Sequence, residues 1–383
     1  MVWYNHWEKP ENPLNTTWTF KIKDNCHNDP LKFKASLCVQ GFNQIEGTDR
    51  GETFVPTKKL STLRMILLYT LHKNLDILQF NVQGAFLPAS LAEEVYIQTP
   101  KGFPRKSPYL RLFKSLCNNN ESMIFFHVDD LILVGPGNKF KENFEKQFSN
   151  SSCHSPNTIL GIKYEITEDT ILLSNPKHIN HGLEELGLLD ARPVSIPLTT
   201  NKQLKEADDE EFEAFKRLNI NYRSAVGLLN YISMHTRPDI SFAISSLARF
   251  STKPSIQHWH EVKKVWLYLK YTKDLKLTLK IRNPNKLLKI YSDSTWADDP
   301  KTRTSQSSYL CYLYGSLILW NSCRQRNITY SSTKAELNPL VDSFHEGIWL
   351  KSLLSNIWRT EVNAATHFID NQDLNKRLHL PEK

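Results

Sequence analysis

The chain has 383 residues, of which 40% are hydrophobic and 23% charged, and it carries a formal net charge of +8. This length allows two or three globular domains, and the positive charge favours a polyanionic partner such as nucleic acid. The six cysteines lack Cys-x-x-Cys and Cys/His spacing, which argues against a zinc module and a disulfide framework. The N-terminus lacks a signal-peptide pattern and no apolar run reaches membrane-spanning length. We therefore expect an intracellular protein, in the cytoplasm or nucleus, with no membrane partner.

The N-terminal part of the chain is rich in strand patterns. Residues 1–17 are polar and interrupted by prolines, so we expect a loose arm. Apolar and basic residues alternate over residues 18–35, which predicts a hairpin with one lysine-rich face that is either solvated or in contact with phosphate. Leucines spaced three and four residues apart after Leu60 predict a helix with one core face. Residues 77–87 predict a strand leading into a turn, and this strand contains Asn81.

Two adjacent carboxylates, Asp129 and Asp130, interrupt an otherwise apolar run over residues 125–135. The run is short, rich in strand formers and closed by Gly-Pro-Gly, so it predicts a tight hairpin with the aspartates at its tip. Aspartate is common in turns, so the pair has an ordinary interpretation as a polar turn. The alternative is a metal site, because divalent cations need carboxylate oxygens in fixed positions.

The middle of the chain changes from strands to helices. Residues 160–174 predict a small sheet, and the strongly polar residues 202–217 predict a linker. Residues 222–271 have mostly helical patterns. Within them, three aromatic residues interleave with lysines and either form helix core, which we favour, or stack on nucleic acid. They are Trp259, Trp266 and Tyr268.

Three further acidic residues lie at the ends or beginnings of predicted elements near the C-terminus. Asp293 ends an apolar strand, Glu336 lies in a helix that opens near Ser331, and Asp370 ends another short strand. The aspartates also suit ordinary turns, and Thr333 with Glu336 matches a helix capping box. Gathered together, the three carboxylates would instead supply oxygen ligands for divalent cations, which lie about 3.5–4 Å apart in two-metal sites.

Several segments resemble one known family. Residues 126–130 are similar to the Tyr-Val-Asp-Asp box of reverse transcriptases, with His127 at the tyrosine position. Residues 47–56 resemble the Gly-x-Asp-x-x-Glu-Thr-Phe-x-Pro segment of Ty1/copia-type retrotransposon Pol polyproteins. The resemblance runs, with gaps, from Trp18 to the C-terminus. It covers the segments of the three C-terminal acids, which are similar in order and spacing to the ribonuclease H region of those polyproteins.

The resemblance implies an α+β or α/β fold in four parts. These parts are a loose arm over residues 1–17, partial polymerase fingers and palm over 18–150, a helical thumb or connection over 151–285, and a partial ribonuclease H-like domain over 286–383. It also implies two sets of ligands for Mg²⁺ or Mn²⁺ in a two-metal arrangement, whose acidic members would be catalytic. The sets are Asn81, Asp129 and Asp130 in the polymerase part, and Asp293, Glu336 and Asp370 in the ribonuclease H-like part. The partners implied are an RNA template, a DNA primer or an RNA/DNA hybrid, and dNTP.

Departures from the family predict a polymerase that has lost its activity. Asn81 stands where the family has a catalytic aspartate, and asparagine is neutral and offers a single carbonyl oxygen. Ser36 and Gln40 replace basic residues of the fingers, and a block of the palm is missing near residues 117–121. We expect a retrotransposon-derived Pol fragment that is truncated, degenerate and catalytically inactive. The alternatives are a working metal-dependent reverse transcriptase with ribonuclease H, and a basic remnant that binds nucleic acid without catalysis.

Two departures concern the ribonuclease H-like part. Pro339 falls inside the helix that presents Glu336, where a proline removes a backbone hydrogen bond at a cost of about 3 kcal/mol. The chain also ends at Lys383, before the segment in which the family places its last catalytic acid. We therefore expect an incomplete active site in this part as well.

Overall fold

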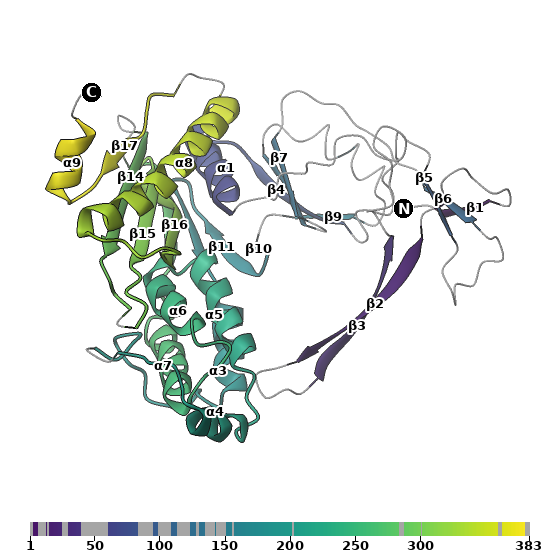
Figure 1. The fold of residues 1–383 in the computed structure, drawn as a ribbon. Coiled ribbons are helices and arrows are strands. Elements are labelled where there is room, and N and C mark those ends of the chain that lie inside the picture. The colour runs from purple at the N-terminus through teal and green to yellow at the C-terminus, as the bar shows by residue number, and fades with distance from the viewer. Residues whose placement is uncertain are drawn as a thin grey trace. The chain divides into compact units, whose positions relative to one another are not determined.

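The computed structural model describes most of the second half of the chain and selected segments of the first. The described residues are 3–6, 13, 15–24, 30–39, 60–82, 95–98, 109–112, 123–127, 130–134, 142, 151–154, 157–200, 203–282, 287–299, 301–358 and 362–379. The chain forms two compact units. The first comprises residues 1–24, 29–58 and 75–156, and the second comprises residues 25–28, 59–74 and 157–383. Most elements of both units are labelled in Figure 1.

The described strands of the first unit form three antiparallel sheets. β2 (Thr16–Asp24) and β3 (Pro30–Val39) pair with each other, which confirms the predicted hairpin. A second sheet has the order β1-β6-β5, from β1 (Trp3–His6), β5 (Val95–Gln98) and β6 (Tyr109–Leu112). The third has the order β7-β8-β4-β9, from β4 (Ile77–Val82), β7 (Met123–His127), β8 (Asp130–Val134) and β9 (Ser151–His154).

The second unit contains an antiparallel four-stranded sheet, whose first three strands follow residue 157. Its order is β10-β11-β12-β13, from β10 (Thr158–Ile159), β11 (Ile162–Ile166), β12 (Thr170–Ser174) and β13 (Leu277–Lys280). Alternate residues of β12, Ile171 and Leu173, are buried, as expected for a strand with one core face. The small sheet predicted over residues 160–174 is confirmed, and a distant strand, β13, completes it.

Five α-helices lie between residues 176 and 271 in the described part of this unit. They are α3 (Pro176–Glu185), α4 (Asp209–Lys216), α5 (Tyr222–His235), α6 (Ser241–Ala248) and α7 (Ile256–Tyr271), with a short 3-10 turn, η2 (Pro238–Ile240), before α6. The helical pattern over residues 222–271 is thus confirmed. Trp259 and Trp266 are 5% and 1% exposed and belong to the shared core of these helices. The interpretation of these two tryptophans as core is confirmed, and they cannot stack on nucleic acid.

The prediction of a linker over residues 202–217 is wrong for the second half of this segment, because that half forms α4. The helix begins with a capping box in which Asp208 accepts from the Glu211 amide at 2.8 Å and Glu211 accepts from the Asp208 amide at 3.2 Å. Phe215 is buried against the neighbouring helices. One cap and one apolar anchor are enough to order this otherwise acidic segment.

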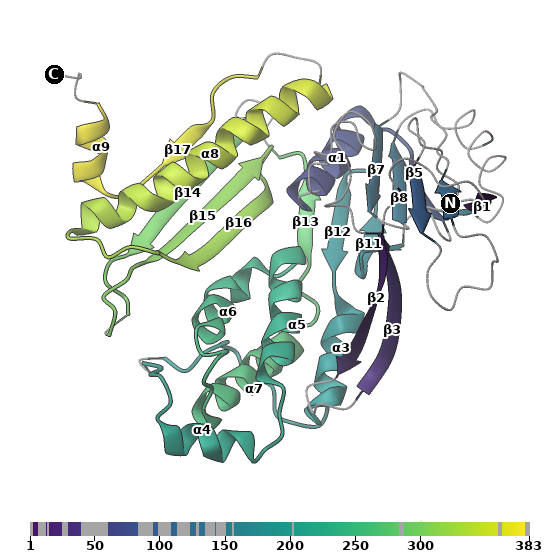
Figure 2. The ribbon, with the colours of Figure 1, turned by 45° about the vertical axis from the view of Figure 1, so that its right-hand side comes forward.

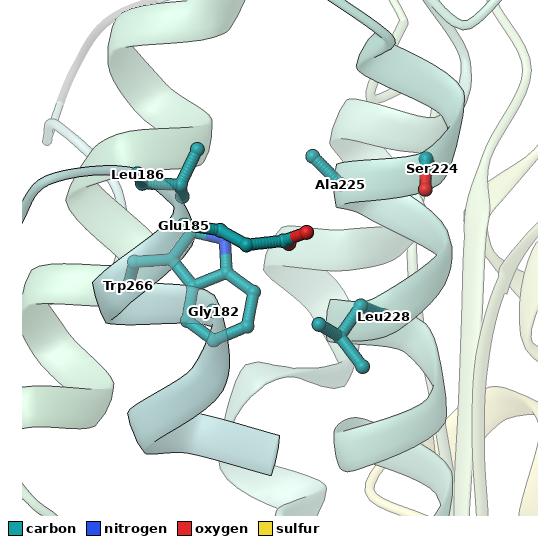
Figure 3. A pocket seen from close by; sticks show the side chains of 7 residues that line it. All are labelled: Gly182, Glu185, Leu186, Ser224, Ala225, Leu228 and Trp266. Atoms are coloured by element: carbon teal, nitrogen blue, oxygen red, sulfur yellow. The ribbon is translucent and has the colours of Figure 1, made fainter. Parts of the chain in front are cut away.

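A small cavity of about 30 Å³ remains between α3, α5 and α7. Figure 3 shows the indole of Trp266 beside Gly182 and the carboxylate of Glu185, with Ala225 and Leu228 of α5 opposite. The indole nitrogen of Trp266 is buried and has no hydrogen-bond partner among the described residues. The close packing of α3 on α7 therefore depends on the shape of the tryptophan ring and on the missing side chain of Gly182.

The C-terminal sheet of the second unit has the order β16-β15-β14-β17. Its elements are β14 (Leu288–Thr295), β15 (Gln306–Leu313), β16 (Ser316–Arg324), α8 (Ser332–Trp358), β17 (Thr366–Phe368) and α9 (Gln372–Leu378). The first three strands are antiparallel and β17 runs parallel to β14. The long helix α8 packs across one face, mainly on β14 and β15 (Figure 2).

α1 (Leu60–Lys73), predicted from its leucine spacing, belongs to this second unit and contacts β13, β16 and α8. Arg64 anchors it. Its guanidinium is 4% exposed and donates to the carbonyl oxygens of Ile318, Met234 and His235 at 2.7–2.8 Å. It also lies 4.1 Å from the ring centroid of Trp320. Burial lowers the pKa of Arg64 to about 9, which leaves the guanidinium charged at neutral pH.

α8 continues without a break through Pro339. A proline deprives the carbonyl four residues earlier, that of Ala335, of its helical donor. The side chain of Gln325 replaces that donor, because its Nε2 donates to the Ala335 oxygen at 2.9 Å. Asn338 in turn donates to Gln325 Oε1 at 2.8 Å. The proline therefore does not interrupt the helix that carries Glu336. Among the described helices, none is both long enough and apolar enough to cross a membrane.

Candidate metal centre

Three carboxylates from three different elements meet at one end of the C-terminal sheet. Asp293 lies near the end of β14, Asp370 follows β17, and Glu336 lies in the first turns of α8. One oxygen of each lies within 4.8 Å of the other two. Three oxygen ligands at this spacing can coordinate a single divalent cation.

The parallel pairing of β14 and β17 brings the two aspartates together. The last register pair joins Tyr291 to Phe368. Continuing that register for two residues brings Asp293 level with Asp370. Side chains two residues apart lie on the same face of a strand, so Asp293 lies on the same face of β14 as Tyr291. Both aspartates are exposed, so solvent and ligands can reach them.

Glu336 approaches the same point from the buried side. Its side chain is 7% exposed, and its Oε2 has no hydrogen-bond partner among the described residues. Burial raises the pKa of Glu336, and the negative charge of Asp293 raises it further. A buried carboxylate oxygen without a donor is costly, and a bound cation would satisfy it.

The capping-box alternative for Glu336 is wrong. The side chain at the start of α8 that accepts a backbone amide is Ser331, whose Oγ accepts from the Lys334 amide at 3.3 Å. The Ala335 amide donates to the Ser331 carbonyl at 3.0 Å. Thr333 therefore lies inside the helix rather than at its cap, and Glu336 faces the sheet. The helix starts two residues earlier than a capping box would require.

Asn81 and Asp130 lie in the first unit, where the structure describes their backbone. β7 and β8 are paired antiparallel up to His127 and Asp130, which leaves a two-residue connection between them. β4 pairs with β8 so that Asn81 is the direct partner of Asp130. Asp129 and the side chains of Asn81 and Asp130 lie outside the described residues. The backbones of Asn81 and Asp130 are thus neighbours, and their role as metal ligands stays a prediction.

Two exposed aromatic residues near the acidic centre were not singled out from the sequence. Trp296 follows Asp293 by three residues and is 47% exposed, and Tyr330 precedes α8 and is 88% exposed. A signal was present, because residues 321–335 contain three basic and no acidic side chains. An aromatic residue in such a basic stretch is typical of nucleic-acid contact.

Comparison with known proteins gives the class of the chain. Residues 4–117 match the family model for reverse transcriptase (RNA-dependent DNA polymerase). The Retrovirus-related Pol polyprotein from transposon TNT 1-94 of Nicotiana tabacum is 31% identical, over 91% of this chain and 30% of that protein. The corresponding polyproteins from transposons RE2 and RE1 of Arabidopsis thaliana are each 28% identical, over 92% of this chain and 27% of their own length.

These matches and the mixed helix and strand architecture place the chain among proteins related to reverse transcriptases. The relatives named above are Pol polyproteins of transposons, and the chain spans less than a third of the length of each. The chain belongs to the Ty1/copia-type retrotransposon Pol polyproteins and is derived from such an element. Reverse transcriptases act on nucleic acids and generally use divalent metals; the three clustered carboxylates lie outside the residues that the family model matches.

Proposed function

We propose that the C-terminal part of this Pol fragment is a ribonuclease H-like domain that binds Mg²⁺ or Mn²⁺ and engages an RNA/DNA hybrid. The sheet order β16-β15-β14-β17, with β17 parallel to β14, supports this layout. So does the position of α8, which connects the antiparallel strands to the parallel one and presents an acid at its start. The polymerase-like part is proposed to be silent.

One observation carries the proposal, namely the convergence of Asp293, Glu336 and Asp370 around a buried carboxylate oxygen that has no partner in the described part of the chain. Asp293 and Asp370 are exposed and would complete the coordination from the solvent side. Glu336 would hold the cation from the buried side. When bound, divalent ions in such sites activate water and stabilise the leaving oxygen of a phosphodiester.

We propose that the polymerase activity is lost because Asn81 stands where the family has a catalytic aspartate. Phosphoryl transfer is catalysed mainly by positioning and by neutralising charge on the phosphate oxygens. Removing one electrostatic stabiliser typically costs about 10² to 10³ in rate, and a neutral side chain in place of a bridging carboxylate should cost at least as much. An RNA template, a DNA primer and dNTP are thus ligands of the family's chemistry that this chain no longer converts.

A second candidate function is hydrolysis of the RNA strand by the C-terminal domain. One observation favours it, because α8 is continuous through Pro339 and the Gln325 side chain compensates the lost backbone bond. The helix that carries Glu336 is not interrupted at the proline. The proline therefore gives no structural reason for the domain to be inactive.

Two assays on the full chain separate these functions. We expect no extension of a primed template by the unmodified chain, and none by Asn81→Asp alone. Extension that is abolished by Asp129→Ala would show that the polymerase part is active and that the proposal is wrong there. Metal-dependent cleavage of a labelled RNA/DNA hybrid that is abolished by Asp293→Asn would establish the second candidate. Binding of the hybrid without cleavage would leave the domain as a non-catalytic remnant.

A further inference from the structure

Two loops at the acidic end of the C-terminal sheet present large aromatic side chains to solvent. Residues 296–305 connect β14 to β15, and residues 325–331 connect β16 to α8. Thr295 pairs with Gln306, which pairs with Arg324, so both loops leave the sheet at the same end. That is the end at which the carboxylate cluster lies.

Side-chain contacts hold the two loops together. The indole nitrogen of Trp296 donates to the Thr329 carbonyl at 3.0 Å. The hydroxyls of Ser305 and Thr329 lie 3.3 Å apart, and Ser305 Oγ accepts from the Ala297 amide at 3.0 Å. The Trp296 ring is therefore anchored through its polar edge while 47% of the residue stays exposed. An exposed ring with a fixed orientation costs little conformational entropy when a flat ligand covers it.

Positive charge accompanies the aromatic rings. Tyr330 is 88% exposed, and the Lys334 ammonium lies 5.6 Å from its ring centroid. Arg326 is exposed in the same loop. Of the three basic side chains between residues 321 and 335, Arg324 is paired with Asp299 of the facing loop at 3.6 Å, so Arg326 and Lys334 supply the positive charge. Aromatic faces flanked by cations suit a ligand that has both flat rings and phosphates.

We propose that Trp296 and Tyr330 form a stacking platform for an unpaired stretch of a nucleic-acid strand beside the acidic centre. The bases would stack on the two rings, and Lys334 and Arg326 would neutralise the neighbouring phosphates. Paired bases hide their faces inside the duplex, so a platform of this kind selects single-stranded segments. The assignment of this strand as the one that reaches the carboxylates rests on the proposed function of the metal centre.

The test measures binding of a fluorescent single-stranded oligonucleotide, by anisotropy, to the full chain at low salt in a chelating buffer. The chelator removes any bound cation, so the result does not depend on whether the three carboxylates bind a metal. We expect Trp296→Ala and Tyr330→Ala each to weaken binding about tenfold or more, and Tyr330→Phe to retain most of it. Tyr271→Ala is the matched control, because Tyr271 is 60% exposed as the last residue of α7 and belongs to neither loop, and it should bind like the unmodified chain.

Salt dependence separates the aromatic from the ionic contribution. Lys334→Ala should lower the slope of log affinity against log salt by about 0.7, since one phosphate contact is lost, whereas Trp296→Ala should leave the slope unchanged. Unfolding temperatures show whether each variant is folded. The platform is overturned if the unmodified chain does not bind, if both alanine variants bind normally, or if Tyr271→Ala is weakened equally. If the unmodified chain binds the oligonucleotide through the platform but Asp293→Asn binds metal as the unmodified chain does, only the proposed metal centre is refuted.

Discussion

At the scale of a single residue, the carboxylate of Glu336 is unfavourable for folding but suited to binding a metal ion. In the metal-free protein one oxygen of its buried carboxylate, Oε2, has no partner among the described residues, and the carboxylate faces the charge of Asp293, which is unfavourable to folding. With a cation bound, the same oxygen becomes a ligand. Binding sites often retain groups that destabilise the empty protein, so removing such a group should raise stability while function is lost.

Glu336→Gln is therefore expected to stabilise the chain in a chelating buffer, by about 1 kcal/mol. The amide keeps the shape of the carboxylate, removes the buried charge and offers an N–H to Asp293. The variant should also lose most of the rise in unfolding temperature that Mg²⁺ or Mn²⁺ gives the unmodified chain. Thermal unfolding with and without metal measures both effects. Asp373→Asn, in the first turn of α9, is the control and should keep the metal response. A Glu336→Gln variant that is less stable in chelator would contradict this interpretation.

The contribution of Gln325 to the stability of the chain should depend on the presence of Pro339. Gln325→Leu should destabilise the chain by about 1–3 kcal/mol, because the buried carbonyl of Ala335 loses its donor. In the Pro339→Ala background the helix regains its own N–H, so the same substitution should cost clearly less. A double-mutant cycle followed by urea unfolding measures this coupling. Additive effects of the two substitutions would show that Gln325 does not compensate for the proline.

At the scale of elements, α1 is attached by a buried cation that has three carbonyl partners. Two of these, from Met234 and His235, belong to the last residues of α5, where the helix dipole favours a positive charge. Arg64→Met should therefore destabilise the second unit by about 3 kcal/mol or more. Hydrogen exchange should also speed up in α1 and along β16. Lys73→Met, an exposed change in the last turn of α1, should leave both unchanged. Equal exchange in the two variants would refute the anchoring role.

The contact between α3 and α7 gives a paired prediction on two glycines. A Cβ added at Gly182 would lie 2.1 Å from the Trp266 ring, whereas a Cβ added at Gly227 in α5 would meet open space. Gly182→Ala should cost about 1–3 kcal/mol through overpacking. Gly227→Ala should instead stabilise α5 by up to about 1 kcal/mol. Denaturant unfolding of the two variants gives both values. A neutral Gly182→Ala would mean that the small cavity beside the indole absorbs the extra methyl group.

At the scale of the whole molecule, local patterns predicted most elements, and long-range contacts decided their roles. Alternation was sufficient for β2 and β3, and helical spacing for α5 to α7. The acidic segment of α4 concealed its helix, although its capping pair and Phe215 were readable signals. The helix beginning at Ser332 could not be separated from a capping box at Thr333, because helix boundaries shift by one or two residues. The partnership of Gln325 with Pro339 depends on tertiary packing and has no sequence signal.

The convergence of Asp293, Glu336 and Asp370 is the central claim, and its prediction required more than composition. Each acid alone suited a turn or a cap, and only their order along the chain indicated a site. The register of β14 with β17 and the start of α8 bring the carboxylates together. The stacking platform at Trp296 and Tyr330 was not anticipated, because the exposure of loop aromatics cannot be read from periodicity.

Calorimetric titration of the full chain with Mn²⁺ tests the central claim most directly. The unmodified chain should show a saturable binding heat, and Asp293→Asn should lose that component because one of the three ligands becomes neutral. Asp373→Asn, which changes an acid outside the cluster, should bind as the unmodified chain does. Identical titrations for the unmodified chain and Asp293→Asn would contradict the assignment of a metal centre to these three carboxylates.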